Sequence, residues 1–230
     1  MRVWQKVFEP RGPATAEDSR DAVYTIANAV TLFRAALAVT LIGTAIVAQS
    51  RSLLLWGLGT SMVFDLADGY IARFTHSISI LGAQLDRLAD SLAALLVCAA
   101  AISMDRDVLT VVAAATVWVE FGVIDQLLAS QFLRFGLWSP DHFYYVDERT
   151  WRMNWSAPAK LAGSLPILLL ATGSSLAWAA FALALLLAIG KIQSMNQITK
   201  VAQHLPSARV PEPDWTDPQR ERRMSCARGG

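Results

Sequence analysis

Long apolar stretches, separated by short polar breaks, fill most of the chain between residue 24 and about residue 194. A helix of roughly 20 apolar residues is long enough to cross the hydrocarbon core of a bilayer. The pattern therefore predicts an all-α integral membrane protein with six transmembrane helices, at residues 24–48, 52–74, 83–104, 108–134, 157–173 and 175–194. The last two helices share one apolar block, which we divide at Thr172-Gly173-Ser174-Ser175 because this composition permits a tight turn.

Both ends of the chain are more polar than the apolar region between residues 24 and 194. Residues 1–23 are interrupted by Pro10 and Pro13, and we expect a short juxtamembrane segment at the membrane interface. Residues 201–230 combine several prolines with mixed charge, which predicts a disordered cytoplasmic tail. The membrane domain is then expected to cover residues 24–200.

The composition and the distribution of charge extend this picture. Only 17% of the residues are charged, against about 25% in soluble domains. The net charge of +1 argues against a nucleic-acid partner, because it leaves no strongly basic surface. Arginine and lysine concentrate at both termini, where Lys191 and Lys200 are counted with the C-terminal tail, and in the connection 134–156. The connections at 49–51 and 105–107 hold one arginine each. The positive-inside rule then predicts a multi-pass protein of the inner or plasma membrane, with both termini in the cytoplasm.

Four aspartates interrupt the apolar pattern where the second predicted helix ends and the third begins. Asp65 and Asp68 are three residues apart, and Asp86 and Asp90 are four apart, so each pair shares one face of its helix. A short loop joins the two helices, which predicts antiparallel neighbours. We therefore expect the two acidic faces to converge at the cytoplasmic edge of the membrane.

Ionised side chains at membrane depth are costly and are functional candidates by default. Carboxylates that face one another repel, and divalent cations such as Mg²⁺ or Mn²⁺ resolve that repulsion because they prefer oxygen ligands. The neighbouring Gly69, Ala72 and Gly82 leave room near the backbone, and the planar fork of Arg73 suits a phosphate. The alternative is that the aspartates form salt bridges with Arg73 and Arg87, or lie at solvated helix ends.

The complete pattern, D-x2-D-G-x2-A-R-x8-G-x3-D-x3-D over residues 65–90, resembles the motif of the CDP-alcohol phosphotransferase family, and all eight of its fixed positions are filled. Residues 25–34 also resemble the opening of the family's first helix, through Asn28, Thr31 and Arg34. In this segment Ala27 stands where many members carry proline.

This resemblance implies a CDP-alcohol donor, in particular CDP-diacylglycerol, a hydroxyl acceptor, release of CMP and two divalent cations, Mg²⁺ or Mn²⁺. It implies that Asp65, Asp68 and Asp86 are metal ligands, and that Asp90 is the general base and a further ligand. It also implies a homodimer, and a CDP site lined by Gly69, Ala72, Arg73 and Gly82, with Asn28, Thr31 and Arg34 nearby.

The acceptor is less constrained by the sequence. A basic set around the connection 134–156, formed by Arg134, Arg149, Arg152 and Lys160, would suit a phosphate-bearing acceptor such as glycerol 3-phosphate or an inositol phosphate. The same residues are equally expected as a flank that fixes topology and attracts anionic lipid.

The aromatic residues of the same connection are expected to form an interfacial belt: Trp138, His142, Tyr144, Tyr145, Trp151 and Trp155. A non-catalytic relative of the family and a divalent-cation transporter are the alternative functions, although we find no repeat typical of transporters.

Overall fold

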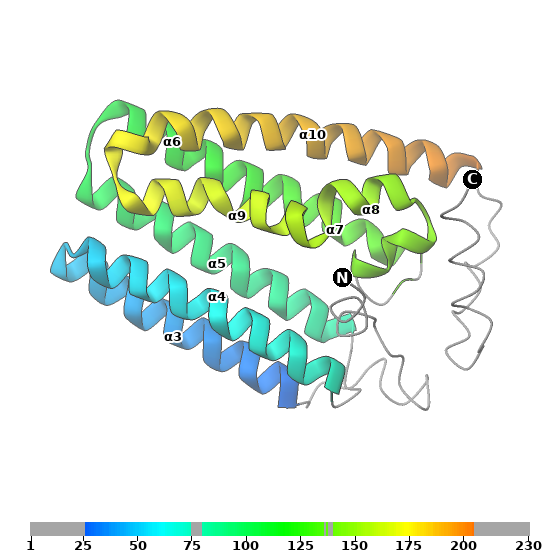
Figure 1. The fold of residues 1–230 in the computed structure, drawn as a ribbon, viewed down its shortest axis with the longest axis horizontal. Helices are drawn as coiled ribbons and strands as arrows, with labels where there is room; N and C mark the ends of the chain where they lie inside the picture. Colours follow the sequence, from blue (N-terminus) through cyan, green and yellow to red (C-terminus); the bar gives the residue numbers. More distant parts are fainter. Residues whose placement is uncertain (1–25, 75–79, 136, 138–139, 205–230) are drawn as a thin grey trace.

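The computed structural model describes residues 26–74, 80–135, 137 and 140–204, except for the side chains of residues 26, 27, 66, 68–74, 80, 145 and 204. The described chain is helical throughout, without a strand (Figure 1). Its elements are α3 (Ile26–Ala48), α4 (Arg51–Phe74), α5 (Ile80–Met104), α6 (Val108–Trp118), η1 (Val119–Ile124), α7 (Asp125–Ser130), η2 (Gln131–Phe135), η3 (Pro140–Tyr145), α8 (Glu148–Asn154), α9 (Ala157–Thr172), η4 (Ser174–Leu176) and α10 (Ala177–His204).

The elements from α6 to η2 form one continuous helical run that corresponds to the fourth predicted helix, 108–134. This run is not a uniform α-helix, because η1 is a π-helical segment in which Asp125 N–H donates to the carbonyl of Glu120, five residues earlier. π-Helical turns are rare and are frequently found at functional sites.

Four stretches of the described helices are long and apolar enough to cross a membrane: Asn28–Ala48, Leu81–Met104, Val108–Phe135 and Ser174–Gln203. The predicted count of six spans is therefore not confirmed by length and hydropathy. α9 has 16 residues, or about 24 Å, which is shorter than the roughly 30 Å of the hydrocarbon core. α4 is long enough, but Arg51 at its start and Asp65, Asp68 and Arg73 near its end shorten its apolar part.

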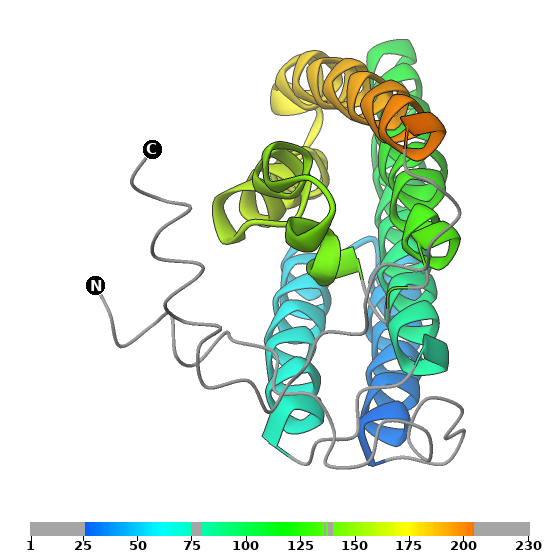
Figure 2. The same cartoon turned by 90° about the vertical axis from the view of Figure 1, so that its right-hand side faces the viewer.

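Small side chains allow the helices to pack closely. α3 packs against α4 and α5, and α10 packs against α6 and α9 (Figures 1 and 2). The main hydrophobic core is rich in alanine, including Ala38, Ala94 and Ala114, as is usual where helices approach one another inside a membrane. At Gly57 a Cβ atom would lie 3.1 Å from Cγ1 of Ile42, so glycine permits the close contact of α3 with α4.

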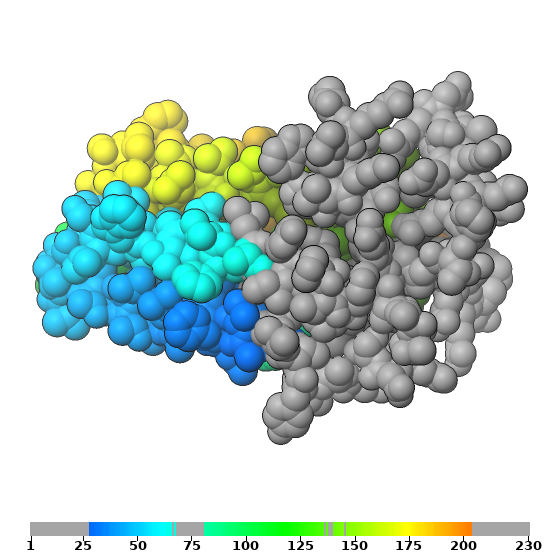
Figure 3. Space-filling model, turned by 60° about the horizontal axis from the view of Figure 1, so that its bottom comes forward, coloured from blue at the N-terminus to red at the C-terminus, as the bar shows by residue number. Residues whose placement is uncertain are grey.

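The outer surface is apolar. Large side chains such as Val47, Trp56 and Leu186 are exposed on the outside of the bundle. Figure 3 shows side chains of α3, α4 and α9 together on one face of the molecule. A soluble protein would bury much of this surface, whereas lipid acyl chains can cover it.

Three short connections meet at one end of the bundle. The Arg51 guanidinium forms an ion pair of 2.5 Å with Asp105, and Gln49 donates a hydrogen bond of 2.9 Å to Ser103. The connection after α9 lies at the same place, since a Cβ atom on Gly173 would lie 3.1 Å from the Arg51 guanidinium. Gly173 has a φ of +136°, a backbone conformation that favours glycine. The predicted division of the last apolar block at residues 172–175 is thus confirmed.

The connection 134–156 is more ordered than a simple loop, because it contains η3 and α8. Phe143 and Trp155 stack with ring centroids 4.6 Å apart inside a second hydrophobic core with Phe132 and Ile198. The predicted interfacial belt is wrong for His142 and Trp155, which are buried. Trp138 and the side chain of Tyr145 lie outside the described residues.

The last helix is longer than predicted. α10 continues to His204, beyond the expected end of its membrane span at residue 194 and beyond the domain limit at residue 200. Residues 201–204 are therefore helical and do not belong to a disordered tail. The expected juxtamembrane segment, 1–23, and the remainder of the tail, 205–230, lie outside the described residues.

Candidate active site

Three of the four predicted aspartates converge where α4 ends and α5 begins. Asp65, Asp86 and Asp90 each offer a carboxylate oxygen, and these three oxygens all lie within 4.8 Å of one another. All three side chains are partly exposed, with 41%, 39% and 29% of their surface accessible. Asp68 lies one helical turn beyond Asp65, and its side chain is outside the described residues. The predicted convergence of the two acidic faces is confirmed for Asp65, Asp86 and Asp90.

The guanidinium of Arg34, on α3, lies among these carboxylates. It donates hydrogen bonds of 2.6 Å to Asp65 and 2.7 Å to Asp86, and its nearest nitrogen lies 3.0 Å from Asp90. Only 1% of Arg34 is exposed, so its charge is held between the helices. The alternative that the aspartates form salt bridges is thus partly right, but in the described residues their partner is Arg34, and Arg87 pairs elsewhere.

The other residues expected near CDP come from the same three elements. Asn28 and Thr31 are buried on α3, about two turns and about one turn before Arg34, respectively. Gly82 is partly buried in the first turn of α5. Gly69, Ala72 and Arg73 lie in the last turns of α4, and their side chains are outside the described residues.

The chemistry of the acidic cluster fits a divalent cation. Its ligand atoms are all carboxylate oxygens, the type that Mg²⁺ and Mn²⁺ prefer. Three carboxylates outnumber the one guanidinium of Arg34, so the cluster keeps a negative charge that attracts cations. Asp65, Asp86 and Asp90 are the described residues that would hold the metal.

The basic set is dispersed over several elements. Arg134 is exposed on η2 and Arg149 on α8. Arg152 is 72% exposed and forms an ion pair of 2.6 Å with Glu148 in the same helix. Lys160, in the first turn of α9, forms an ion pair of 2.8 Å with Asp141 on η3.

The charge of Lys160 also acts on its partner. Partial burial tends to raise the pKa of Asp141, but the attraction of Lys160, with smaller contributions from Arg87 and His142, outweighs it. The pKa of Asp141 therefore lies below its ordinary value, and its carboxylate remains ionised at neutral pH.

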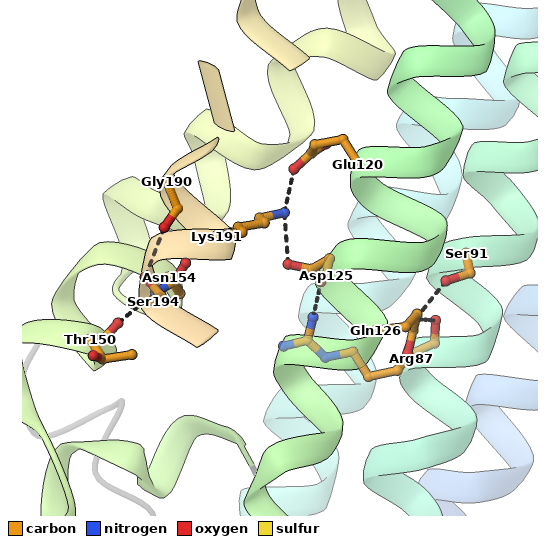
Figure 4. Close-up of polar contacts among 10 residues, drawn as sticks. All are labelled: Arg87, Ser91, Glu120, Asp125, Gln126, Thr150, Asn154, Gly190, Lys191 and Ser194. Atoms are coloured by element: carbon orange, nitrogen blue, oxygen red, sulfur yellow. Dashed lines mark hydrogen bonds and ion pairs between the residues drawn. The ribbon is translucent and has the colours of Figure 1, made fainter. Parts of the chain in front are cut away.

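Sequence reasoning missed a second polar cluster next to the site. Lys191 was counted among the basic residues of the cytoplasmic tail, but it is buried in α10 and pairs with Glu120 and Asp125. Arg87 pairs with Asp125 at 2.6 Å (Figure 4). The available signal was the presence of Glu120 and Asp125 inside the apolar segment 108–134, because charges at membrane depth need partners.

The fold and the site together define a helical membrane protein with a cluster of carboxylates that fits a divalent cation at one end of its helices. A family model described as CDP-alcohol phosphatidyltransferase matches residues 24–190. The chain therefore belongs to the CDP-alcohol phosphatidyltransferase family. No curated protein and no solved structure matches the chain.

Membership of this family supports a transferase that acts on a CDP-alcohol in phospholipid synthesis, with an alcohol as acceptor. The matched range contains the acidic cluster, Arg34 and three residues of the second polar cluster, Arg87, Glu120 and Asp125, and Lys191 directly follows it.

Proposed function

We propose that the protein transfers a phosphatidyl group from CDP-diacylglycerol to the hydroxyl group of a second substrate and releases CMP. The observation that carries this proposal is the convergence of Asp65, Asp86 and Asp90 within 4.8 Å in a chain of this family. Such a cluster suits the pyrophosphate of a CDP-alcohol, whose negative charge has to be neutralised before a hydroxyl can attack.

In the proposed reaction the acceptor oxygen bonds to the phosphatidyl phosphorus, and the bond from that phosphorus to the bridging oxygen breaks. The bridging oxygen leaves with CMP. Two divalent cations, Mg²⁺ or Mn²⁺, would supply charge neutralisation when bound. Asp65, Asp68, Asp86 and Asp90 would hold them, and Asp90 would also accept the proton of the attacking hydroxyl.

The remaining residues of the motif would bind the donor. Gly69, Ala72, Arg73 and Gly82 would line the CDP site, close to Asn28 and Thr31. The apolar outer surface lets the acyl chains of the donor remain in the bilayer while its head group reaches the carboxylates.

The proposed acceptor carries a phosphate, as glycerol 3-phosphate and inositol phosphates do. Arg134, Arg152 and Lys160 would contact this phosphate. Among them Lys160 is the most informative, because it lies just inside α9, in its first turn, where a charge that only fixes topology has least reason to be. We further propose six membrane spans, cytoplasmic termini, and a homodimer, the last on the family resemblance alone.

The test is an assay of the purified protein with labelled CDP-diacylglycerol, Mg²⁺ and a panel of acceptors, scored for CMP release and lipid product. We expect product with a phosphate-bearing acceptor and none after chelation of the metal. Asp90→Asn should lower kcat by roughly 10²–10⁴-fold, the usual contribution of a general base. Asp107→Asn, at the opposite end of the bundle, is the matched control and should retain activity.

Full activity in metal-free buffer, or a wild-type rate for Asp90→Asn, would contradict the mechanism. Absence of CMP release with every acceptor, in protein that still binds Mn²⁺, would favour the non-catalytic relative. Uptake of Mn²⁺ into vesicles that contain the protein would favour the transporter.

A further inference from the structure

The second polar cluster joins three parts of the bundle through buried charges. The Lys191 ammonium on α10 lies 2.5 Å from Glu120 and 2.7 Å from Asp125, and Asp125 lies 2.6 Å from the guanidinium of Arg87 on α5 (Figure 4). Less than a fifth of each of these four side chains is exposed. Two carboxylates and two cations balance one another, as charges buried away from water require.

The π-helical segment η1 explains how one lysine reaches both carboxylates. In an α-helix, residues five positions apart point about 140° away from each other, because each residue turns the chain by about 100°. The wider turn at η1, closed by the hydrogen bond from Asp125 N–H to the carbonyl of Glu120, brings these two residues toward the same side. The π turn at η1 therefore allows Lys191 to pair with both Glu120 and Asp125.

The contacts of α7 on α5 fall on the turn that carries the candidate metal ligands. Asp125 binds the side chain of Arg87. The adjacent Gln126 donates hydrogen bonds of 2.7 Å to the carbonyl of Arg87 and 2.5 Å to the hydroxyl of Ser91. Arg87 directly follows Asp86, and Ser91 directly follows Asp90. Two consecutive residues of α7 thus hold the turn of α5 from both ends.

Arg87 is close enough to the acidic cluster to compete for it. Arg87 directly follows Asp86 on α5, and Asp90 comes three residues after it, about one helical turn away. Without Asp125, these two carboxylates and Asp141 remain as the counter-ions of its charge. A guanidinium that pairs with Asp86 or Asp90 opposes the binding of a divalent cation.

We infer that Asp125 and Gln126 are positioning residues of the acidic cluster: they fix the turn of α5 that carries Asp86 and Asp90, and Asp125 keeps Arg87 from occupying these carboxylates. The inference rests on the proposed function to the extent that the cluster binds a divalent cation. It does not depend on which donor or acceptor is used.

The experiment measures Mn²⁺ binding to the purified full chain by electron paramagnetic resonance, without substrates. The signal that Asp86→Asn removes defines binding at the cluster. Asp125→Asn, which keeps the size of the side chain, should raise the Kd for Mn²⁺ about tenfold or more, the effect of a cation brought close to a carboxylate. The double variant Asp125→Asn/Arg87→Gln should recover most of the affinity, because the competing guanidinium is gone.

Glu120→Gln is the matched control. It changes the same buried cluster, but the ion pair of Glu120 joins η1 to α10 and not to α5, and Lys191 keeps Asp125 as its partner. This variant should leave the Kd for Mn²⁺ unchanged. If Asp125→Asn does not fold, Gln126→Leu decides instead: it removes both hydrogen bonds to α5 without a change of charge, and it should also weaken Mn²⁺ binding.

An unchanged Kd in Asp125→Asn, or a double variant as weak as the single one, would overturn the inference and leave a purely structural role. Loss of affinity in Glu120→Gln equal to that in Asp125→Asn would do the same. Failure of the proposed function is distinguishable, because it would leave wild-type Mn²⁺ binding and its dependence on Asp125 intact while CDP-diacylglycerol is not consumed.

Discussion

The side chain of Arg34 pairs with carboxylates in the structure, although the family resemblance suggests a place near CDP. The family motif suggests that it lies near CDP, whereas in the structure it contacts all three described aspartates of the cluster. These contacts tie α3 to α4 and α5 at the site and lower the repulsion between the carboxylates. A phosphate of the donor would meet a guanidinium that is already fixed in position, which favours recognition.

Lys160 is the residue that best separates the two explanations of the basic set. If Lys160 binds an acceptor phosphate, its loss removes a charge-assisted hydrogen bond of about 1.5–3 kcal/mol. Lys160→Gln should then raise the KM for the acceptor by roughly 10–150-fold, with the KM for the donor nearly unchanged. Lys160→Arg should restore part of the affinity. Steady-state kinetics at saturating donor concentration measures both values.

Loss of Asp141, the ion-pair partner of Lys160, should change the KM for the acceptor in the opposite direction and therefore provides a control. Asp141→Asn removes the partner of Lys160 and leaves the ammonium available, so the KM for a phosphate-bearing acceptor should fall. If the lysine only fixes topology or attracts anionic lipid, neither Lys160→Gln nor Asp141→Asn should change the KM for the acceptor. In that case insertion, or the dependence of activity on lipid charge, should change instead.

The helices are set by ordinary local signals at several of their ends. Asp107 is the N-cap of α6, where its carboxylate accepts hydrogen bonds from Thr110 N–H (2.9 Å) and from the Thr110 hydroxyl (2.6 Å). Asp147 caps α8 in a similar way through Arg149 N–H. Gly173 ends α9 with a positive φ that few other residues adopt. The helix boundaries therefore depend on single side chains.

Asp107→Ala should lower the thermal midpoint of unfolding by a few degrees, whereas Asp107→Asn and Asp107→Ser, which can cap a helix, should lower it less. The hydrogen bonds from Thr110 hold the pKa of Asp107 below its ordinary value. A lowered pKa stabilises the fold above the pKa of the unfolded state, and this contribution is lost as the pH falls through the folded-state value. The difference between wild type and Asp107→Ala should therefore shrink below about pH 4.

A wild-type midpoint for Asp107→Ala, or a difference that grows under acidic conditions, would contradict this role of Asp107. Scanning fluorimetry in detergent at several pH values provides both measurements.

The positions of the connections at the ends of the bundle indicate how many helices cross the membrane. Arg51 pairs with Asp105, and Gln49 with Ser103, so the connections after α3 and after α5 lie at the same end of the molecule. Gly173 beside Arg51 brings the connection after α9 to that end as well. This arrangement favours six spans, although within the described residues four helical stretches meet the criteria of length and hydropathy. α4 and α9 miss these criteria because charged residues lie near the end of α4 and because α9 has 16 residues.

Labelling of introduced cysteines can determine the number of membrane spans. In a background with Cys98 and Cys226 replaced by alanine, we would introduce Arg106→Cys, Ser174→Cys or Arg149→Cys and label intact cells with an impermeant maleimide. Six spans with cytoplasmic termini predict labelling at 106 and 174 and protection at 149. If α4 and α9 do not cross, the labelling of 106 and 149 should be exchanged.

The sequence by itself determined the local features of this protein. The apolar lengths predicted the helices, the glycine and serines at 172–175 predicted a turn, and the spacing of Asp65, Asp86 and Asp90 predicted their convergence. These predictions succeed because each feature depends on residues that are neighbours in the sequence. A helix fixes which residues share a face, and a short connection makes two helices adjacent.

Only the tertiary structure decided which charges pair across distant helices. Arg34 lies 31 residues from Asp65 and 52 from Asp86, and Lys191 belongs to a different helix from Glu120 and Asp125. Periodicity shows which face a residue occupies but not which helix that face meets, because this depends on how all the helices pack together. The same limit explains why Lys191 was interpreted as part of the tail and why Trp155 was expected at the membrane interface: burial is a property of the whole bundle.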